Sequence, residues 1–344
     1  MNITVLCGGL SGERDVSLTS GLMCAKSLSK KGHKVFLLDV FMGTEVTADE
    51  AFSGETDFES QTSSIDVNEP DLEKIKEMRG ESPDGFFGKN VLDICKKSDI
   101  VFMALHGANG EDGKIQATFD LLGIKYTGSD YLGSANAMNK GITRRLLIAD
   151  GIKMAGGTSY TAEDHRNGKT DEWDFFPCIV KPCCGGSSIG VSRAENKAEF
   201  KKALDECFRY EDEAVVEKFI KGREFSVGVL DGKALPVIEI IADGFYDYKN
   251  KYSGKTLEVC PAEIDDVLAK KLGRTAEQAF SVLKLCVYSR FDFIVNEAGE
   301  IYCLEANTLP GMTQASLIPQ EAAVIGLNHA DLCDFIVKKS LERF

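Results

Sequence analysis

Short apolar runs alternate with a helical pattern in the first part of the chain. Residues 3–7 are an apolar run that leads into a glycine loop at 8–12, and residues 15–31 carry apolar side chains at helical spacing. Further apolar runs at 35–40 and 100–105 predict two more strands. This alternation predicts an α/β fold whose first part is a doubly wound parallel sheet.

A polar segment at 44–81 interrupts this pattern. It is acidic and poor in large apolar residues, so we expect loops and one short helix there. Beyond it, a helix is predicted at 139–150. The strands predicted after that helix lie at 177–181, 189–191, 215–219, 224–230 and 235–241. A chain of 344 residues with these elements favours three α/β domains, predicted at 1–130, 131–215 and 216–344.

Residues 287–304 predict an antiparallel hairpin, because a β-branched and aromatic run, a turn sequence and a second apolar run follow one another. Alternation along the first strand places Arg290 and Asp292 on the same face. The pairing expected across the turn puts Asp292 opposite Cys303 and diagonal to Glu305.

Hard oxygen ligands gather on this hairpin. Asp292 and Glu305 supply carboxylates, and Asn307 adds an amide oxygen on the same face if the strand continues. Mg²⁺ prefers octahedral oxygen coordination and takes only a few protein ligands, which leaves positions for phosphates. We therefore expect a magnesium-nucleotide site here. The alternative is a hairpin with a solvated acidic face.

Composition and charge narrow the class of protein. Hydrophobic residues make up 43% and charged residues 27%, as in an ordinary soluble globular protein. No apolar run approaches the roughly 18 residues of a membrane span, and the N-terminus lacks the regions of a signal peptide, so we expect a cytoplasmic protein. A net charge of −14 argues against nucleic acid or an anionic membrane as a partner. Any phosphate site must then use locally placed lysines, arginines and backbone N–H groups.

The cysteines do not suggest a metal or disulfide framework. Eleven are scattered along the chain without a CxxC pair, and Cys183 and Cys184 are adjacent. We expect reduced, mostly buried thiols.

The first glycine loop is a weak match to a dinucleotide-binding fingerprint. Its spacing is GGxxG, and Glu13 would repel a pyrophosphate at the start of the following helix. A glutamate there suits a cationic group such as an ammonium. The alternative is that Glu13 is only a helix-start residue favoured by the helix dipole.

Two further glycine loops are candidates for ligand contact. The loop at 106–113 follows a strand, where ligands sit in open α/β sheets, although it could also be a tight turn. The loop at 181–190 is not a Walker A sequence, but its glycines, hydroxyls and Lys181 suit a flap over phosphates; the alternative is a plain hairpin loop. Residues 217–220 combine polar and apolar side chains, and with free backbone groups they would suit a segment that contacts an adenine edge. Glu224 could accept ribose hydroxyls, although such residues are more often ordinary strand and turn positions.

Several sequence blocks occur together in a specific order. They are GGLSGERDVSL at 8–18, HGANGEDG at 106–113, YTGS at 126–129, VKPCCGGSSIGV at 180–191, EKFIKGREFSVGV at 217–229, FYDYKNKY at 245–252, RFDF at 290–293 and EANTLPGMTQASLIP at 305–319. With these blocks the chain resembles the D-alanine–D-alanine ligases of the ATP-grasp superfamily over nearly its whole length. The resemblance implies a three-domain ATP-grasp architecture.

The resemblance also implies site residues. ATP would be bound by Lys140, Lys181, Ser188, Glu217, Lys218, Ile220 and Glu224. Two Mg²⁺ ions, with Mn²⁺ as an alternative, would be held by Asp292, Glu305 and Asn307. The catalytic residues would be Glu13, Ser187, Tyr252, Arg290 and Gly311, and the substrate-binding residues His106, Lys251, Ser316 and Leu317. Departures from the usual family residues are Asp15, Asn139 and the pair Cys183–Cys184.

The implied function is ATP-dependent ligation of two D-alanines through an acyl phosphate, for peptidoglycan precursor synthesis, in a homodimer. The resemblance also implies that related ligases that use D-lactate carry a histidine where this chain has Tyr252, so D-alanine is the expected second substrate. The alternatives are a D-alanine–D-serine ligase of the vancomycin-resistance type, another ATP-grasp ligase or carboxylase, and a non-enzymatic nucleotide-binding module.

Overall fold

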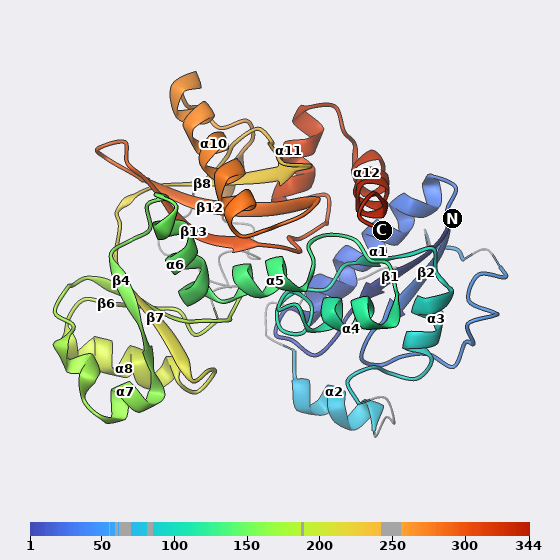
Figure 1. Ribbon diagram of the computed structural model, residues 1–344, viewed down its shortest axis with the longest axis horizontal. Coiled ribbons are helices and arrows are strands. Elements are labelled where there is room, and N and C mark those ends of the chain that lie inside the picture. Colours follow the sequence, from blue (N-terminus) through green and yellow to red (C-terminus); the bar gives the residue numbers. More distant parts are fainter. Residues whose placement is uncertain (55, 59–60, 62–69, 81–84, 187–188, 242–255) are drawn as a thin grey trace.

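Three sheets, each flanked by helices, make up the part of the chain that the computed structural model describes (Figure 1). That part comprises residues 1–54, 56–58, 61, 70–80, 85–186, 189–241 and 256–344. The helices are α1 Arg14–Lys30, α2 Leu72–Arg79, α3 Val91–Lys97, α4 Lys114–Leu122, α5 Tyr131–Met138, α6 Lys140–Ala149, α7 Ala162–Arg166, α8 Lys197–Cys207, α10 Asp266–Val282, α11 Leu317–Val324 and α12 His329–Leu341, with the 3₁₀ helix η1 at Lys169–Glu172. The predicted helix at 139–150 is confirmed as α6, and the short helix expected in the acidic segment as α2.

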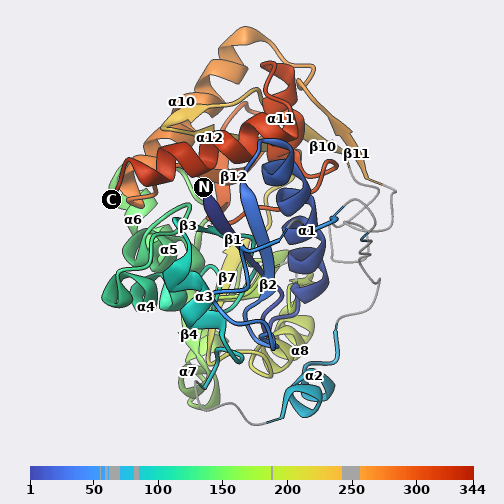
Figure 2. The ribbon, with the colours of Figure 1, turned by 90° about the vertical axis from the view of Figure 1, so that its right-hand side faces the viewer.

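The N-terminal sheet is parallel, as predicted. Its order is β2-β1-β3, with β1 at Asn2–Cys7, β2 at Lys34–Asp39 and β3 at Ile100–Met103. From β1 the chain forms β2 on one side of β1 and then crosses to the other side of β1 to form β3. Because both crossovers are right-handed, α1 and α3 lie on opposite faces of the sheet. Figure 2 shows the two helices on either side of the strands.

The C-terminal helix belongs to the core of this first sheet. Leu332 and Ile336 of α12 are fully buried in the same hydrophobic cluster as Ile3 and Phe102. Helix α12 packs against α1 and β3 (Figure 1). The two ends of the chain are therefore held together by apolar contact.

The central sheet is antiparallel and has the order β4-β7-β5-β6. The strands are β4 Gly157–Thr161, β5 Cys178–Pro182, β6 Ser192–Ala194 and β7 Glu213–Lys218. The strand predicted at 189–191 is wrong: residues 189–190 form a turn, and Gly190 has φ +70°, a left-handed conformation that interrupts an extended strand. The strand begins only at Ser192, where it pairs with Val180.

The third sheet has the order β11-β10-β8-β12-β13, and β9 pairs with β8. Its strands are β8 Gly222–Leu230, β9 Lys233–Ala234, β10 Ile238–Ile241, β11 Leu257–Val259, β12 Tyr288–Asn296 and β13 Ile301–Asn307. The strand predicted at 235–241 is confirmed only from Ile238 to Ile241, because residues 235–237 are irregular. Pro236 lies in the irregular part and has no N–H to donate to a ladder.

The predicted hairpin is confirmed as β12 and β13, but its register differs from the expectation. Phe293 pairs with Cys303, the register then shifts, and Asp292 pairs directly with Glu305. This irregularity leaves Leu304 as the extra residue on β13, as in a β-bulge. The predicted pairing of Asp292 with Cys303 is wrong for two reasons. Val295 pairs with Ile301, one position beyond the expected Glu300, and the extra residue then moves the partner of Asp292 by one more position.

In the described part of the chain, no helix is both long and apolar enough to cross a membrane. The cysteines are mostly buried thiols, as predicted. The division into domains at 1–130, 131–215 and 216–344 stays a prediction.

Candidate active site

A cavity of about 280 Å³ lies between the central sheet and the third sheet. Its walls include apolar side chains from both sheets, such as Ile179 and Leu304. Of the predicted ATP residues, those that the structure describes all line it: Lys140, Lys181, Glu217, Lys218, Ile220 and Glu224. Asp292 and Glu305 line it as well. Residues predicted as separate groups thus form one cavity; Ser188 lies outside the described residues.

Three buried charges on the central sheet and α6 carry a net positive charge at one wall of this cavity. Lys181 Nζ lies 2.6 Å from one carboxylate oxygen of Glu217, and an Arg144 guanidinium nitrogen lies 2.9 Å from the other. All three side chains are buried. Two cations share one carboxylate, so one positive charge remains near the cavity, which suits a phosphate. Arg144 was not predicted as a site residue, because the sequence of a helix with more than one arginine does not indicate which of them pairs with Glu217.

Lys140 connects the loop after β5 with the hairpin. Its ammonium donates to the carbonyl of Gly185 and lies 3.7 Å from a Glu305 carboxylate oxygen. It is the first residue of α6, where the Asn139 side chain caps the helix by accepting the N–H of Ile142 at 2.8 Å. The capped helix start therefore sets the position of the ammonium.

Residues 217–220, at the end of β7 and directly after it, contribute side chains to the cavity, but not all of their backbone groups are free. The N–H groups of Lys218 and Phe219 donate to the carbonyls of Gly156 and Pro177 at 2.8 and 3.0 Å. The expectation of free backbone groups is therefore wrong for these two N–H groups. The Lys218 ammonium lies 3.5 Å from the ring centroid of Phe175, which holds this lysine at the cavity rim.

Asp292 is the most heavily coordinated carboxylate of the hairpin. Arg290 donates to both of its oxygens at 3.0 and 2.9 Å, and the Ser226 hydroxyl donates to one of them at 2.8 Å. Asn307 donates its amide N–H to the other at 3.3 Å. The predicted placement of Arg290 and Asp292 on one face is confirmed.

The donor set fits a magnesium site. Asp292 and Glu305 are directly paired across the hairpin, and both face the same cavity. Paired residues have Cβ atoms about 4.5–5.5 Å apart, so two carboxylates can approach one hard cation or two adjacent ones. Asn307 lies on the same strand and adds an amide group beside Asp292.

A second, smaller pocket adjoins the first. It is lined by Glu13, Glu111 and Asn307, and it shares Lys140, Gly186 and Glu305 with the larger cavity. A Cβ on Gly186 would lie 2.5 Å from a Glu13 carboxylate oxygen, so Glu13 packs directly against the loop after β5. Ser187, Lys251 and Tyr252, which are predicted to close this site, lie outside the described residues.

Glu111, which was not predicted as a site residue, lines this pocket and is buried. It accepts the N–H of Gly107 at 2.9 Å and the N–H of Leu309 at 3.0 Å. Burial, followed by the nearby charge of Glu13, raises the pKa of Glu111 to about 7. Glu111 lies within the loop at 106–113, a predicted candidate for ligand contact, so its position in the sequence could have identified it as a site residue.

His106 holds the loop that follows the hairpin. Its Nδ1 lies 2.7 Å from the carbonyl of Leu309, and its Nε2 lies 3.2 Å from the Ser20 hydroxyl. Ser20 in turn accepts the N–H of Met312 at 3.2 Å. Burial lowers the pKa of His106, which favours the neutral imidazole.

The remaining predicted residues, Gly311, Ser316 and Leu317, lie on the loop after β13 and at the start of α11, and they are not among the described residues that line the two pockets. A Cβ on Gly311 would lie 2.8 Å from the Ser316 hydroxyl, so the loop is tightly folded there. Ser316 accepts the N–H of Thr313 at 3.0 Å and stands immediately before α11. Leu317 is buried at the start of that helix.

Family models match nearly the whole chain. The model described as D-ala D-ala ligase N-terminus matches residues 2–129, and the model described as D-ala D-ala ligase C-terminus matches residues 148–338. A D-alanine--D-alanine ligase of Pediococcus pentosaceus is 44% identical, over 98% of this chain and 97% of the relative. One of Lacticaseibacillus casei is 40% identical, over 100% of this chain and 97% of the relative.

Solved structures show the same likeness. A D-alanine--D-alanine ligase from Bacillus anthracis is similar with a TM-score of 0.76 and 32% identity, over 99% of this chain and 98% of that one. The same ligase complexed with ATP has a TM-score of 0.73 and 29% identity, over 99% and 97%. VanG D-Ala:D-Ser ligase from Enterococcus faecalis has a TM-score of 0.76 and 28% identity, over 98% and 99%.

Proposed function

The chain belongs to the D-alanine–D-alanine ligase family, and from that premise we propose how its two adjoining pockets perform the reaction. The protein is an ATP-dependent ligase that joins two D-alanines for peptidoglycan synthesis. The observation that carries the proposal is the continuity of the pockets: the predicted nucleotide residues line the larger one, and Glu13 lines the smaller one beside Glu305.

The larger cavity binds ATP with its phosphates toward Lys140 and Lys181. The positive charge left over from Arg144, Lys181 and Glu217 attracts the phosphates, and the carboxylate of Glu217 holds Lys181 in place. The apolar walls contact the adenine, with Lys218 and Ile220 at its edge and Glu224 toward the ribose.

Asp292, Glu305 and Asn307 would hold two Mg²⁺ ions, with Mn²⁺ as an alternative. When bound, the ions offset the negative charge of the phosphate oxygens. The buried Ser226 hydroxyl and Arg290 orient the Asp292 carboxylate for this role. Lys140 lies close enough to Glu305 to limit the repulsion between the two paired carboxylates.

In the smaller pocket Glu13 binds the ammonium of the first D-alanine. The carboxylate of this D-alanine attacks the γ-phosphate of ATP, which gives an acyl phosphate and ADP. The deprotonated amine of the second D-alanine, positioned by Lys251, Ser316 and Leu317, then attacks the acyl carbon and displaces phosphate. Arg290 and the N–H of Gly311 stabilise the oxyanion of that step. Ser187 and Tyr252 close the site and exclude water, with His106 supporting the loop above it.

D-alanine is the proposed second substrate, and D-serine is the competing candidate because a D-Ala:D-Ser ligase is among the similar structures. A small pocket rejects one added hydroxyl only weakly. The larger assembly is inferred from the family alone: three domains at 1–130, 131–215 and 216–344, a homodimer formed through the N-terminal domains, and a cytoplasmic location.

The test is ADP release coupled to product analysis. With ATP and Mg²⁺, ADP should form rapidly with D-alanine and only slowly with L-alanine or without an amino acid. D-alanine, D-serine and D-lactate in competition at pH 7–8 should give mostly D-alanyl-D-alanine. Dominant depsipeptide would contradict the role of Tyr252, whereas dominant D-alanyl-D-serine would change the substrate and leave the mechanism intact.

A further inference from the structure

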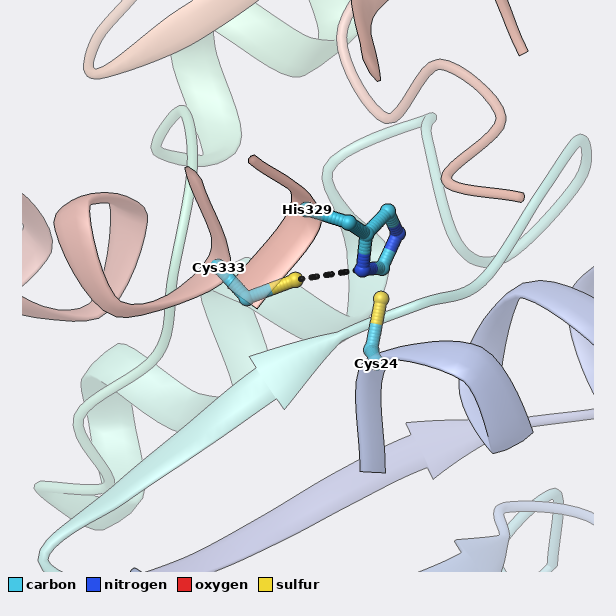
Figure 3. A group of neighbouring side chains, drawn as sticks. All are labelled: Cys24, His329 and Cys333. Carbon is cyan, nitrogen blue, oxygen red and sulfur yellow. Dashed lines mark hydrogen bonds between the residues drawn. The ribbon is translucent and has the colours of Figure 1, made fainter. Parts of the chain in front are cut away.

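Two cysteines and a histidine from opposite ends of the chain meet on one side of the N-terminal sheet (Figure 3). Cys24 lies on α1, while His329 and Cys333 lie one turn apart on α12 and so share a face of that helix. The ligand atoms of all three side chains lie within 4.8 Å of one another. None of these residues belongs to the ligase site.

The histidine ring is held with one nitrogen directed at the sulfurs. Its Nε2 lies 2.7 Å from the carbonyl of Met312, and because a carbonyl only accepts, Nε2 must carry the proton. In the neutral ring Nδ1 is then the acceptor, and it lies 3.7 Å from Cys333 Sγ. A metal-ligating histidine commonly donates its other N–H to a carbonyl in this way.

One ligand separation matches that of a tetrahedral zinc site. Zinc–sulfur bonds of about 2.3 Å and zinc–nitrogen bonds of about 2.0–2.1 Å place the two ligand atoms about 3.5–3.6 Å apart. The observed separation of Cys333 Sγ and His329 Nδ1 is 3.7 Å. This pair therefore already has the required separation, and Cys24 Sγ lies within 4.8 Å of both atoms.

The chemistry of the cluster selects the metal. Cys24 and Cys333 are fully buried, and His329 is half-buried, so a metal can enter on the histidine side. Thiolate and imidazole ligands suit Zn²⁺, whereas Mg²⁺ and Mn²⁺ prefer oxygen. The Ser27 hydroxyl lies 2.7 Å from His329 Nδ1. A metal bound to this nitrogen would displace the hydroxyl.

We propose that Cys24, His329 and Cys333 bind one Zn²⁺ ion that joins α1 to α12. Metal binding would deprotonate the two thiols, release their protons and tie the first helix of the chain to the last. The His329–Met312 hydrogen bond extends this link to the loop that carries Gly311. The site is thus a structural staple behind the ligase site.

Cobalt substitution tests the proposal on the whole reduced protein. Co²⁺ added in the presence of excess Mg²⁺, which occupies oxygen sites, should produce thiolate-to-cobalt charge-transfer absorption with one Co²⁺ per chain. Added Zn²⁺ should abolish that absorption. Cys24→Ser and Cys333→Ser should each remove most of it.

Two other cysteine variants serve as matched controls. Cys207→Ser alters a buried thiol of the central sheet's core and should keep the full signal. Cys183→Ser tests the adjacent cysteine pair, which is the competing sulfur site. A signal that survives Cys333→Ser but is lost in Cys183→Ser would overturn the proposal.

A second measurement remains useful if the serine variants fold poorly. Zn²⁺ should raise the Tm of the wild-type protein and of Cys207→Ser, because a ligand of the native state stabilises that state. Absence of both the cobalt absorption and the Tm shift in the wild type would overturn the proposal.

Discussion

The carboxylate of Glu111 accepts the backbone N–H of Leu309, which stands 198 positions later in the chain, at 3.0 Å. The bond joins the loop at 106–113 to the loop that follows β13. Because the group is buried beside Glu13, its pKa is raised to about 7 from the ordinary value near 4.5.

The raised pKa makes the contribution of Glu111 to stability depend on pH. Between about pH 4.5 and 7 the folded state holds a proton that the unfolded state has lost, so stability falls as pH rises through this window and is constant above it. The difference in free energy of unfolding between wild type and Glu111→Gln should shift by roughly 3 kcal/mol across the window. Urea unfolding of both proteins at pH 5, 6, 7 and 8 measures it. A difference that does not change with pH would show that Glu111 does not hold the proton.

Removing one charge from the hairpin should stop ATP turnover without unfolding the protein. Glu305→Gln keeps the shape of the side chain but weakens a Mg²⁺ ligand, and Asp292→Asn does the same. Each variant should lose nearly all ADP release at low Mg²⁺, with an unchanged circular dichroism spectrum. Glu300→Gln, at the turn end of the hairpin and paired with Lys153, is the control. Near-normal turnover by Glu305→Gln at low Mg²⁺ would remove Glu305 from the metal site.

Arg290→Lys should slow the ligation by about 10²–10³, the scale of one lost oxyanion donor. Lysine keeps the charge but cannot donate to both oxygens of Asp292 and reach the oxyanion in the same geometry. Arg223→Lys is a matched control, because Arg223 makes a similar two-point pair with Glu239 at 2.7 Å on the same sheet. Steady-state kcat for dipeptide formation separates the two. Equal, small effects would assign Arg290 to a structural ion pair.

Arg144→Met should weaken ATP binding and lower stability together. The substitution removes one of the two cations that pair with the buried Glu217 carboxylate. The group of Arg144, Lys181 and Glu217 then loses its net positive charge. Breaking a buried pair costs about 3–5 kcal/mol, and the KM for ATP should rise about tenfold or more. Arg145→Met, on the same helix but exposed, should change neither quantity. Thermal unfolding with and without ATP, together with the KM for ATP, provides the comparison. A stability loss without a KM change would make Arg144 purely structural.

Much of the architecture follows from local pattern. The run at 3–7 and the helical spacing after it are sufficient to predict β1 and α1. A short continuous apolar run is typical of a strand buried on both faces, and apolar residues at a period of 3.6 mark the face that a helix buries. The same alternation predicted that Arg290 and Asp292 share a face, and the structure confirms it. The nucleotide residues could be named before the fold was known because their motifs are contiguous and ordered.

Tertiary structure decided the features that depend on distant segments. Asp292 lies opposite Glu305 because one extra residue enters β13, which alternation does not anticipate. Arg144 finds Glu217, and Glu111 finds Leu309, only once separate elements pack together. These contacts are set by side-chain packing and desolvation rather than by sequence spacing.

The cluster of Cys24, His329 and Cys333 likewise depends on tertiary structure rather than on sequence spacing. The spacing of the cysteines predicted no zinc site, since metal motifs are recognised from ligands close together in the chain. Cys24 and Cys333 meet because burial of apolar side chains such as Leu332 and Ile336 brings the last helix onto the first sheet. The sequence by itself determined the elements and the ligase motifs, whereas the hydrophobic packing of the two chain ends alone decided that a cysteine from each would share a buried site with His329.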